Sequence, residues 1–352
     1  MGRQSTVTLR ELECMLCDET AEPKALPLSL LEEITDGFSD EQQIGRGGFA
    51  VVYKGKLDNR TVAVKKMFNT YMHEKEFQQE VECLMMVKHK NVVRFLGYCA
   101  DRQGSMERYN GKFVMADVHQ RLLCFEFLPR GNLHEYISDT SHGLRWRERY
   151  HIITGICQGL HYLHEKDIVH LDLKPSNILL DDNLIPKIAD FGLSRCFAGM
   201  QSRVITVIAA TFGYMAPECC DHTEITYRHS YRLDIYSLGV IIIEILTGKK
   251  GYHAVENVVE SWSNMLGRSQ SDVQLDQVRV CAEIGLECTD FNPAKRPDTQ
   301  YIISRLKETE TVDVYIKTDV ITSQQAEDTP NELHQDMANT PGETSYKASF
   351  FV

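Results

Sequence analysis

The sequence lacks a long uninterrupted apolar run. Its longest such stretch, Leu238 to Leu246, contains Glu244 and falls well short of the roughly 20 residues that a membrane-spanning helix needs. The N-terminal residues also lack the apolar centre of a secretory signal. We therefore expect a soluble, intracellular chain.

A disulfide framework is missing as well. The 11 cysteines are scattered, and most lie inside apolar runs such as Leu122–Phe125. This usage is typical of free thiols in a reducing compartment. Cys14 and Cys17 form the one close pair, without the second pair or the histidines that a zinc site needs. A metal or redox role for this pair stays open as the alternative.

An excess of basic residues is also absent. Acidic residues outnumber basic ones by 50 to 38, a net charge of −12, which argues against nucleic-acid binding. The acidity lies in the flanks, because residues 1–37 carry −5, residues 308–352 carry −7, and 38–307 are neutral. A basic substrate groove in the centre is therefore not excluded, and we expect the flanks to be solvated, mutually repelling arms.

The 352 residues, 43% of them apolar, suffice for two lobes. Before the main domain, Ser29 and Glu32 predict a capping box for a short helix. Periodicity predicts strands at 50–56, 61–65, 92–98 and 121–127, and helices at 74–88, 147–165, 233–247, 255–266, 278–288 and 299–308. Residues 101–120 are expected to form a long surface loop, and residues 308–352 a mostly disordered tail. The predicted fold class is α+β, a small β-rich lobe followed by a larger helical lobe.

A glycine cluster opens the main domain. Ile44, Gly45, Arg46, Gly47 and Gly48 precede a stretch in which Phe49, Val51 and Tyr53 alternate. The alternation predicts a strand–turn–strand flap that can cover phosphates, whereas a dinucleotide fold would continue into a helix. Taken alone, the cluster favours the flap, with a plain glycine-rich hairpin as the alternative.

A lysine ends the next predicted strand. Lys65 follows Val62-Ala63-Val64, and a buried lysine is costly unless it meets an anion. Glu80, on the following predicted helix, can pair with it. The alternative is that the two residues are unrelated surface charges.

Two further motifs bring carboxylates together. Residues 170–177 read His-Leu-Asp-Leu-Lys-Pro-Ser-Asn, and Asp190-Phe191-Gly192 follows. A carboxylate with a carboxamide suits Mg²⁺, and a second carboxylate can orient a hydroxyl for attack.

The glycine cluster, Lys65, Glu80 and the two motifs are followed by Ala216-Pro217-Glu218. In this order and at these spacings they resemble the motifs of eukaryotic protein kinases, over about 38–307. The resemblance implies a bilobal kinase fold, with an N-lobe at about 38–128 and a C-lobe at about 129–307. Three segments look like the plant receptor-like kinase/Pelle family: the glycine flap, Asn91–Cys99 and Thr211–Glu218. Leu26–Thr35 resembles the segment before the kinase domain there. Without an ectodomain or a membrane span, the chain looks like a receptor-like cytoplasmic kinase.

The resemblance implies roles for individual residues, with ATP and Mg²⁺ as cofactors. Lys65, held by Glu80, would contact the α- and β-phosphates, and Asp190 and Asn177 would hold Mg²⁺. Asp172 would accept the proton of the substrate hydroxyl, and Lys174, typical of the serine/threonine class, would touch the γ-phosphate. The remaining nucleotide contacts would come from Ile44, Gly45, Gly47, Val52, Ala63, Phe125 as gatekeeper, Glu126 and Leu128 of the hinge, and Leu179.

Several residues are assigned by the resemblance to the scaffold or to regulation. Asp234 and Arg296 are structural, with Arg296 paired to Glu218. Thr211 is expected to bond to Asp172 and Lys174, whereas Ser202 and Thr206 are the expected phosphorylation sites.

Three residues depart from the family pattern. Ala50 replaces the third glycine of the flap, and Ala210 replaces a glycine before Thr211. Leu171 replaces the arginine that normally binds a phosphorylated activation loop. Family members without this arginine are called non-RD kinases, a group linked to innate immune receptors. We therefore expect activation not to depend on that contact.

Two readings of function remain. An active protein kinase would act on protein substrates, downstream of a membrane receptor kinase. A pseudokinase scaffold, the alternative, predicts damage at Lys65, Asp172 or Asp190, and all three are intact.

Met1-Gly2 with Thr6 fits the N-myristoylation pattern, with chance as the alternative explanation of so short a match. One acyl chain binds membranes marginally, so S-acylation of Cys14 or Cys17 would have to supply a second anchor. The expected location is the cytoplasm, and with lipidation the inner face of the plasma membrane.

Overall fold

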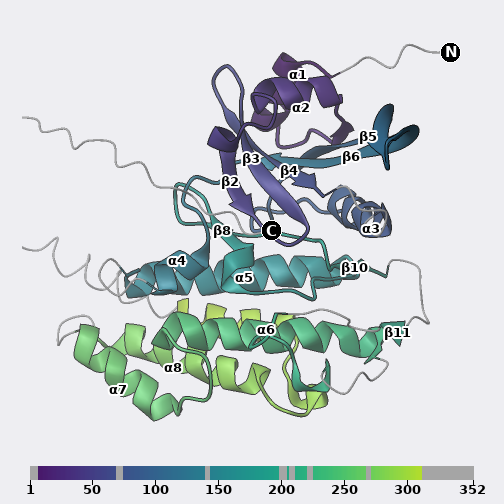
Figure 1. The fold of residues 1–352 in the computed structure, drawn as a ribbon. Helices are drawn as coiled ribbons and strands as arrows, with labels where there is room; N and C mark the ends of the chain where they lie inside the picture. Colours follow the sequence, from purple (N-terminus) through teal and green to yellow (C-terminus); the bar gives the residue numbers. More distant parts are fainter. Residues whose placement is uncertain are drawn as a thin grey trace, which may run out of the picture.

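The computed structural model describes residues 7–68, 74–138, 143–197, 204–205, 211–219, 225–266 and 271–310. These form two lobes, which confirms the predicted bilobal α+β kinase architecture (Figure 1). The N-lobe contains a six-stranded sheet in the order β1-β5-β6-β4-β3-β2. Its strands are β1 (Lys24–Ala25), β2 (Gln43–Arg46), β3 (Ala50–Lys56), β4 (Thr61–Met67), β5 (Phe95–Tyr109) and β6 (Lys112–Glu126).

Helices cover both faces of this sheet (Figure 1). The helices α1 (Leu9–Cys17) and α2 (Leu28–Ile34) lie on the face that points away from the C-lobe, where Leu12 and Leu31 pack with Val62 and Val64 of β4. On the other face, α3 (Glu74–Met85) contributes Phe77 and Leu84 to the main core. This sandwich fixes the strand that carries Lys65.

The C-lobe is mainly helical (Figure 1). Its helices are α4 (Leu133–Ser138), α5 (Trp146–Glu165), α6 (Tyr227–Thr247), α7 (Val255–Leu266), α8 (Ser271–Cys288) and a last helix over residues 299–310. Short strands form three two-stranded sheets: β7 (Ile168–Val169) with β10 (Arg195–Cys196), β8 (Ile178–Leu180) with β9 (Pro186–Ile188), and β11 (Val204–Ile205) with β12 (Ile225–Thr226). Single 3-10 turns occur at Asp40–Gln42, Pro175–Asn177, Pro217–Cys219 and Pro293–Lys295. None of the helices in the described part of the chain is both long and apolar enough to cross a bilayer.

The N-terminal flank is not the solvated arm that its acidity predicted. Leu12 and Leu31 are fully buried, and β1 pairs in parallel with β5 through Lys24–Gly97 and Ala25–Tyr98. The capping box expected at Ser29 is also wrong, because α2 begins after Pro27 without a side-chain cap. A capping box instead starts α1, where Thr8 and Glu11 satisfy each other's backbone N–H groups.

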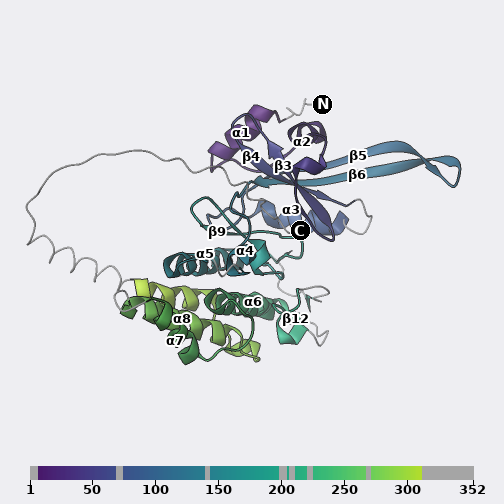
Figure 2. The same ribbon diagram turned by 60° about the vertical axis from the view of Figure 1, so that its left-hand side comes forward.

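The surface loop expected at residues 101–120 is also wrong. The strands β5 and β6 continue through it as an antiparallel ribbon, from Ala100 opposite Arg121 to Tyr109 opposite Lys112. Figure 2 shows this hairpin projecting far from the N-lobe. Its turn is Asn110-Gly111, both with positive φ (50° and 79°), as a two-residue hairpin turn of the mirror-image type requires.

Gly97 allows β1 to approach β5. A Cβ atom at this position would lie 2.1 Å from the carbonyl oxygen of Lys24, so Gly97→Ala must displace β1. We expect the free energy of unfolding to fall by about 1–3 kcal/mol, measured by urea denaturation. The control is Gly104→Ala in the same strand, where the added methyl would meet only Met115 Sδ at 3.4 Å. Equal stability of the two variants would contradict this role of Gly97.

Candidate active site

A cleft between the lobes gathers most of the predicted nucleotide contacts. Of these, the cleft is lined by Val52, Ala63, Lys65, Glu80, Phe125, Glu126, Asn177, Leu179 and Asp190. Ile44, Gly45, Gly47 and Leu128 were also expected there and are not among its lining residues. Leu128 is buried and belongs to the main core.

The cleft also contains residues that the sequence did not single out, namely Val93, Ser176 and Ala189. Ser176 and Ala189 directly precede the predicted Asn177 and Asp190, so proximity to those motifs could have found them. Val93 precedes β5, and its backbone N–H donates to the Ile188 carbonyl at 2.9 Å. No motif marked it.

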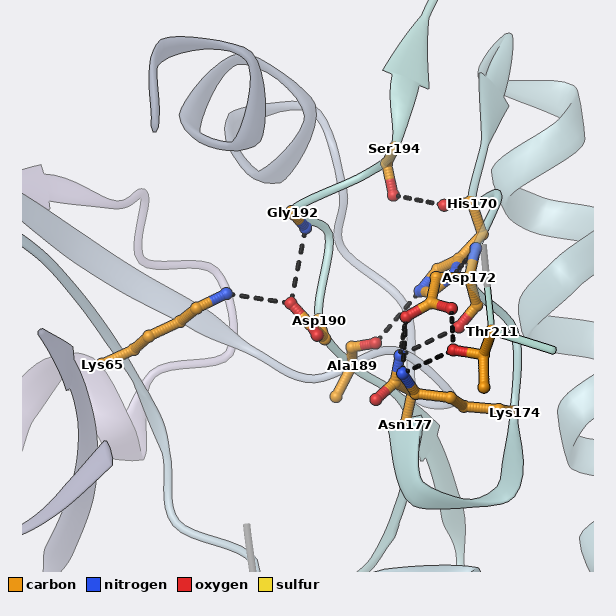
Figure 3. A network of polar contacts seen from close by, with 10 residues as sticks. All are labelled: Lys65, His170, Asp172, Lys174, Asn177, Ala189, Asp190, Gly192, Ser194 and Thr211. Carbon is orange, nitrogen blue, oxygen red and sulfur yellow. Dashed lines mark hydrogen bonds and ion pairs between the residues drawn. The ribbon is translucent and has the colours of Figure 1, made fainter. Parts of the chain in front are cut away.

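Lys65 links three elements of the cleft. Its Nζ lies 2.8 Å from Glu80 Oε1 on α3 and 2.9 Å from Asp190 Oδ1. Burial alone would lower the pKa of Lys65, but the two carboxylates raise that pKa above its ordinary value. The lysine is therefore a permanent cation at the inner end of the cleft, and Figure 3 shows its side chain pointing at Asp190.

The two carboxylates differ in their electrostatics. Burial raises the pKa of Glu80, and the Lys65 ammonium only partly opposes this effect. Burial also acts to raise the pKa of Asp190, but Lys65 outweighs it and the net pKa is lowered. Of the two carboxyl groups, Asp190 is therefore the one that loses its proton more readily. It has a positive φ of 63°, a strained backbone of the kind that functional sites retain.

The catalytic-loop residues converge around Asp172 (Figure 3). Its Oδ2 accepts hydrogen bonds from Lys174 Nζ at 2.7 Å and Asn177 Nδ2 at 3.2 Å. Its Oδ1 accepts one from Thr211 Oγ1 at 2.7 Å, and Lys174 Nζ donates to the same hydroxyl at 3.0 Å. The expected contacts of Thr211 with Asp172 and Lys174 are thus confirmed.

His170 holds this loop in place from the core. It is fully buried, and its Nδ1 accepts from the Asp172 backbone N–H at 3.3 Å, while Nε2 lies 3.0 Å from the Ala189 carbonyl. Because a backbone N–H can only donate and a carbonyl can only accept, the proton must sit on Nε2. The neutral ring therefore connects Asp172 to the segment that carries Asp190.

Asn177 has an unused acceptor. The residue is 1% exposed, and its Oδ1 has no hydrogen-bond partner among the described residues. A buried, unsatisfied carbonyl oxygen is costly, and here it lines the same cleft as Asp190. Carboxamide and carboxylate oxygens are the donors that Mg²⁺ prefers, so the two residues present fit that cation.

The departures from the family pattern are accommodated by packing. Ala50 is fully buried and belongs to the main core rather than the lining of the cleft. Leu171 has a left-handed backbone with φ of 67° and touches two apolar clusters, one with Phe197 and Val169, the other with Ala216 and Leu233. The third departure, Ala210, lies outside the described residues.

The scaffold residues behave as predicted. Arg296 donates to both carboxylate oxygens of Glu218 at 2.6 and 2.7 Å. Asp234 accepts the backbone N–H groups of His170 and Leu171, both at 2.8 Å. The Asp234 bonds anchor the catalytic loop to α6, and neither Asp234 nor Arg296 is among the residues that line the cleft.

Residues 38–306 match the family model of the protein kinase domain. The chain belongs to the protein kinase family. It is 37% identical over 312 residues to the cysteine-rich receptor-like protein kinase 2 of Arabidopsis thaliana, which covers 81% of this chain and 45% of that protein. A G-type lectin S-receptor-like serine/threonine-protein kinase of the same plant is 37% identical over 309 residues, or 81% of this chain and 36% of the relative.

A rice relative, cysteine-rich receptor-like protein kinase 10 of Oryza sativa subsp. japonica, is 35% identical over 310 residues. The match covers 82% of this chain and 45% of that protein. The chain therefore spans less than half the length of these relatives. Its kinase domain is of the plant receptor-like type.

Proposed function

We propose that this protein is an ATP- and Mg²⁺-dependent serine/threonine kinase that transfers the γ-phosphate of ATP to hydroxyl groups of proteins. One observation carries the proposal: Lys65, Glu80 and Asp190 form a connected charge network beside Asn177, whose side chain bonds to Asp172. A phosphate-binding cation, two Mg²⁺ ligands and a proton acceptor are thereby within one site. The name of one relative, a receptor-like serine/threonine-protein kinase, supports the same assignment.

Each of these site residues has a defined task in this reaction. Lys65, fixed by Glu80, presents a cation to the phosphates, and Asn177 and Asp190 supply oxygen ligands. Bound Mg²⁺ would neutralise charge on the phosphates. The Thr211 hydroxyl donates to Asp172 Oδ1, so the Asp172 carboxylate is able to accept from a hydroxyl. The substrate hydroxyl would lose its proton to that carboxylate.

A phosphorylation assay with Mg²⁺ and ATP tests the proposal against the scaffold alternative. The wild-type chain should incorporate phosphate into itself or a general protein substrate. Asp190→Asn removes one charge from the metal site and from the Lys65 pair, and should lose that incorporation. Equal incorporation by both proteins would overturn the enzymatic proposal and favour a scaffold.

We also propose a place for this kinase in plant receptor-linked signalling of the defence or stress type. The similarity to receptor-like kinases supports an upstream membrane receptor kinase as a partner. We propose a cytoplasmic location, at the inner face of the plasma membrane if Gly2 is acylated. Gly2 lies outside the described residues, and the intact mass of protein expressed in plant cells would report the lipid.

Activation is proposed to follow the non-RD pattern. The apolar contacts of Leu171 with Phe197 and Ala216 occupy the position where a phosphate-binding arginine would stand. We therefore expect Thr206→Ala, at a position outside the described residues, to lower phosphotransfer by less than about tenfold, because no arginine–phosphate contact is lost. A loss on the order of 100-fold with unchanged thermal stability would contradict this mode of activation.

A further inference from the structure

The C-terminal end of α1 is held by a distant arginine. Arg94 Nη1 donates to the Leu16 carbonyl at 3.2 Å, and Nη2 donates to the carbonyls of Met15 and Asp18. The last carbonyls of a helix lack intrahelical partners and carry the negative end of its dipole. The last turn of α1 has no basic residue of its own. Arg94 therefore supplies both the hydrogen bonds and the positive charge that this end requires.

The backbone of the same arginine is tied to the hinge end of β6. The Arg94 N–H donates to Glu126 Oε1 at 2.8 Å, and the Glu126 N–H donates to the Arg94 carbonyl at 3.0 Å. These reciprocal bonds fix both the main chain and the carboxylate of Glu126. A shift of Arg94 would therefore change the position of Glu126 as well.

Glu126 reaches the nucleotide cleft and the C-lobe. It lines the cleft, and its Oε1 also accepts from Lys187 Nζ on β9 at 2.8 Å. The strand β9 leads directly to Ala189 and Asp190. Contacts thus run without interruption from α1, on the far face of the sheet, to the wall of the cleft.

We propose that Arg94 is a positioning residue for the nucleotide site, and that docked α1 supplies the acceptors that keep it in place. When α1 leaves the sheet, the guanidinium loses its three carbonyl partners, and the segment that fixes Glu126 loosens. Nucleotide affinity then falls, whereas the Asp172 network is unaffected. This inference rests on the proposed ATP-binding function.

Two substitutions in the full-length chain break this connection at different points. Arg94→Met retains the aliphatic stem and removes every donor. Leu12→Asp places a carboxylate at a fully buried site of α1 and disfavours its docking. We expect each to raise the KM for ATP by about fivefold or more, with kcat within about twofold. Because both interrupt one connection, the double variant should be no worse than the poorer single variant.

Glu13→Gln is the matched control. Glu13 also lies on α1, and its Oε1 accepts from the Asn59 N–H at 2.7 Å, but among the described residues it is not a hydrogen-bond partner of Arg94. Its KM should stay within about twofold of wild type. If Leu12→Asp does not fold, Leu12→Ala takes its place, because truncation at this fully buried position weakens the packing of α1 on the sheet. Additive effects, or an Arg94→Met variant with the wild-type KM, would overturn the proposal.

Two further measurements separate this inference from the proposed function. If the wild type binds MgATP but transfers no phosphate, the same variants are compared by their Kd for the nucleotide, and the same fivefold pattern is expected. If it binds no nucleotide, hydrogen exchange of the apo protein decides. Arg94→Met should then speed exchange at the Glu126 amide and leave α8 unchanged. Unchanged exchange at Glu126 would refute the role of Arg94.

Discussion

Replacing Asp172 by asparagine should reduce phosphotransfer by a factor on the order of 10² to 10⁴, the usual contribution of a general base. The variant keeps the size of the side chain, but its amide has a single acceptor oxygen, so it can keep the contact of either Lys174 or Thr211 and not both. What is lost is the negative charge that accepts the proton of the substrate hydroxyl. Because Asp172 does not line the nucleotide cleft, the Kd for MgATP should be unchanged. Steady-state kinetics and nucleotide titration together measure the two effects.

Asp182→Asn provides the control for this prediction. Asp182 is an exposed residue of the same lobe, so the same chemical change there should leave turnover within about twofold of the wild type. If Asp172→Asn retained more than about a tenth of wild-type turnover, proton acceptance by Asp172 would not be part of the mechanism.

The second large effect concerns stability. Arg296 is only 1% exposed, and Arg296→Met would leave the Glu218 carboxylate without its bidentate partner. It would also remove donors to the Asp290 and Arg232 carbonyls at 2.9 and 2.8 Å. Because Arg296 is buried while the Glu218 side chain is 21% exposed, breaking this pair should lower the free energy of unfolding by up to about 3–5 kcal/mol, measured by urea denaturation.

Arg147→Met, at an exposed position of α5, is the matched control and should change stability by less than about 0.5 kcal/mol. A loss below about 1 kcal/mol in Arg296→Met would mean that Arg296 does not hold the C-lobe together. The double variant Arg296→Met/Glu218→Gln should recover part of the loss, because the Glu218 carboxylate whose Arg296 partner is missing is then removed as well.

The catalytic residues could be predicted because their chemistry is local. Lys65 follows β-branched residues in its own strand, and residues 170–177 place a carboxylate, an ammonium and a carboxamide within one short loop. Such short patterns specify side-chain types at fixed spacings, and the fold then brings them together.

The wall of the nucleotide cleft was predicted less completely. Val93 enters the cleft through a tertiary contact with Ile188 that no spacing in the sequence encodes.

The two large errors have different physical origins. The β5–β6 ribbon projects beyond the sheet, and Met106, Phe113 and Met115 are all exposed. Because no face of the ribbon there is buried, its sequence does not need to alternate between apolar and polar residues. Without a buried face, periodicity gives no strand signal, and only Asn110-Gly111 marked the turn. In the N-terminal flank, the net charge concealed an amphipathic helix, although Thr8 and Glu11 signalled its start.

The docking of α1 has a consequence for synthesis. This helix leaves the ribosome before the sheet on which it packs, because its apolar side shares a cluster with Val64, Leu96 and Leu122 and its cap, Arg94, lies 78 residues beyond Leu16. At a typical elongation rate of about 5–20 residues per second, the apolar side of α1 waits for several seconds before these partners appear. During that interval Leu12 and Met15 are available to chaperones. Although α1 is made before the sheet, it is therefore one of the last parts of the N-lobe to reach its final position.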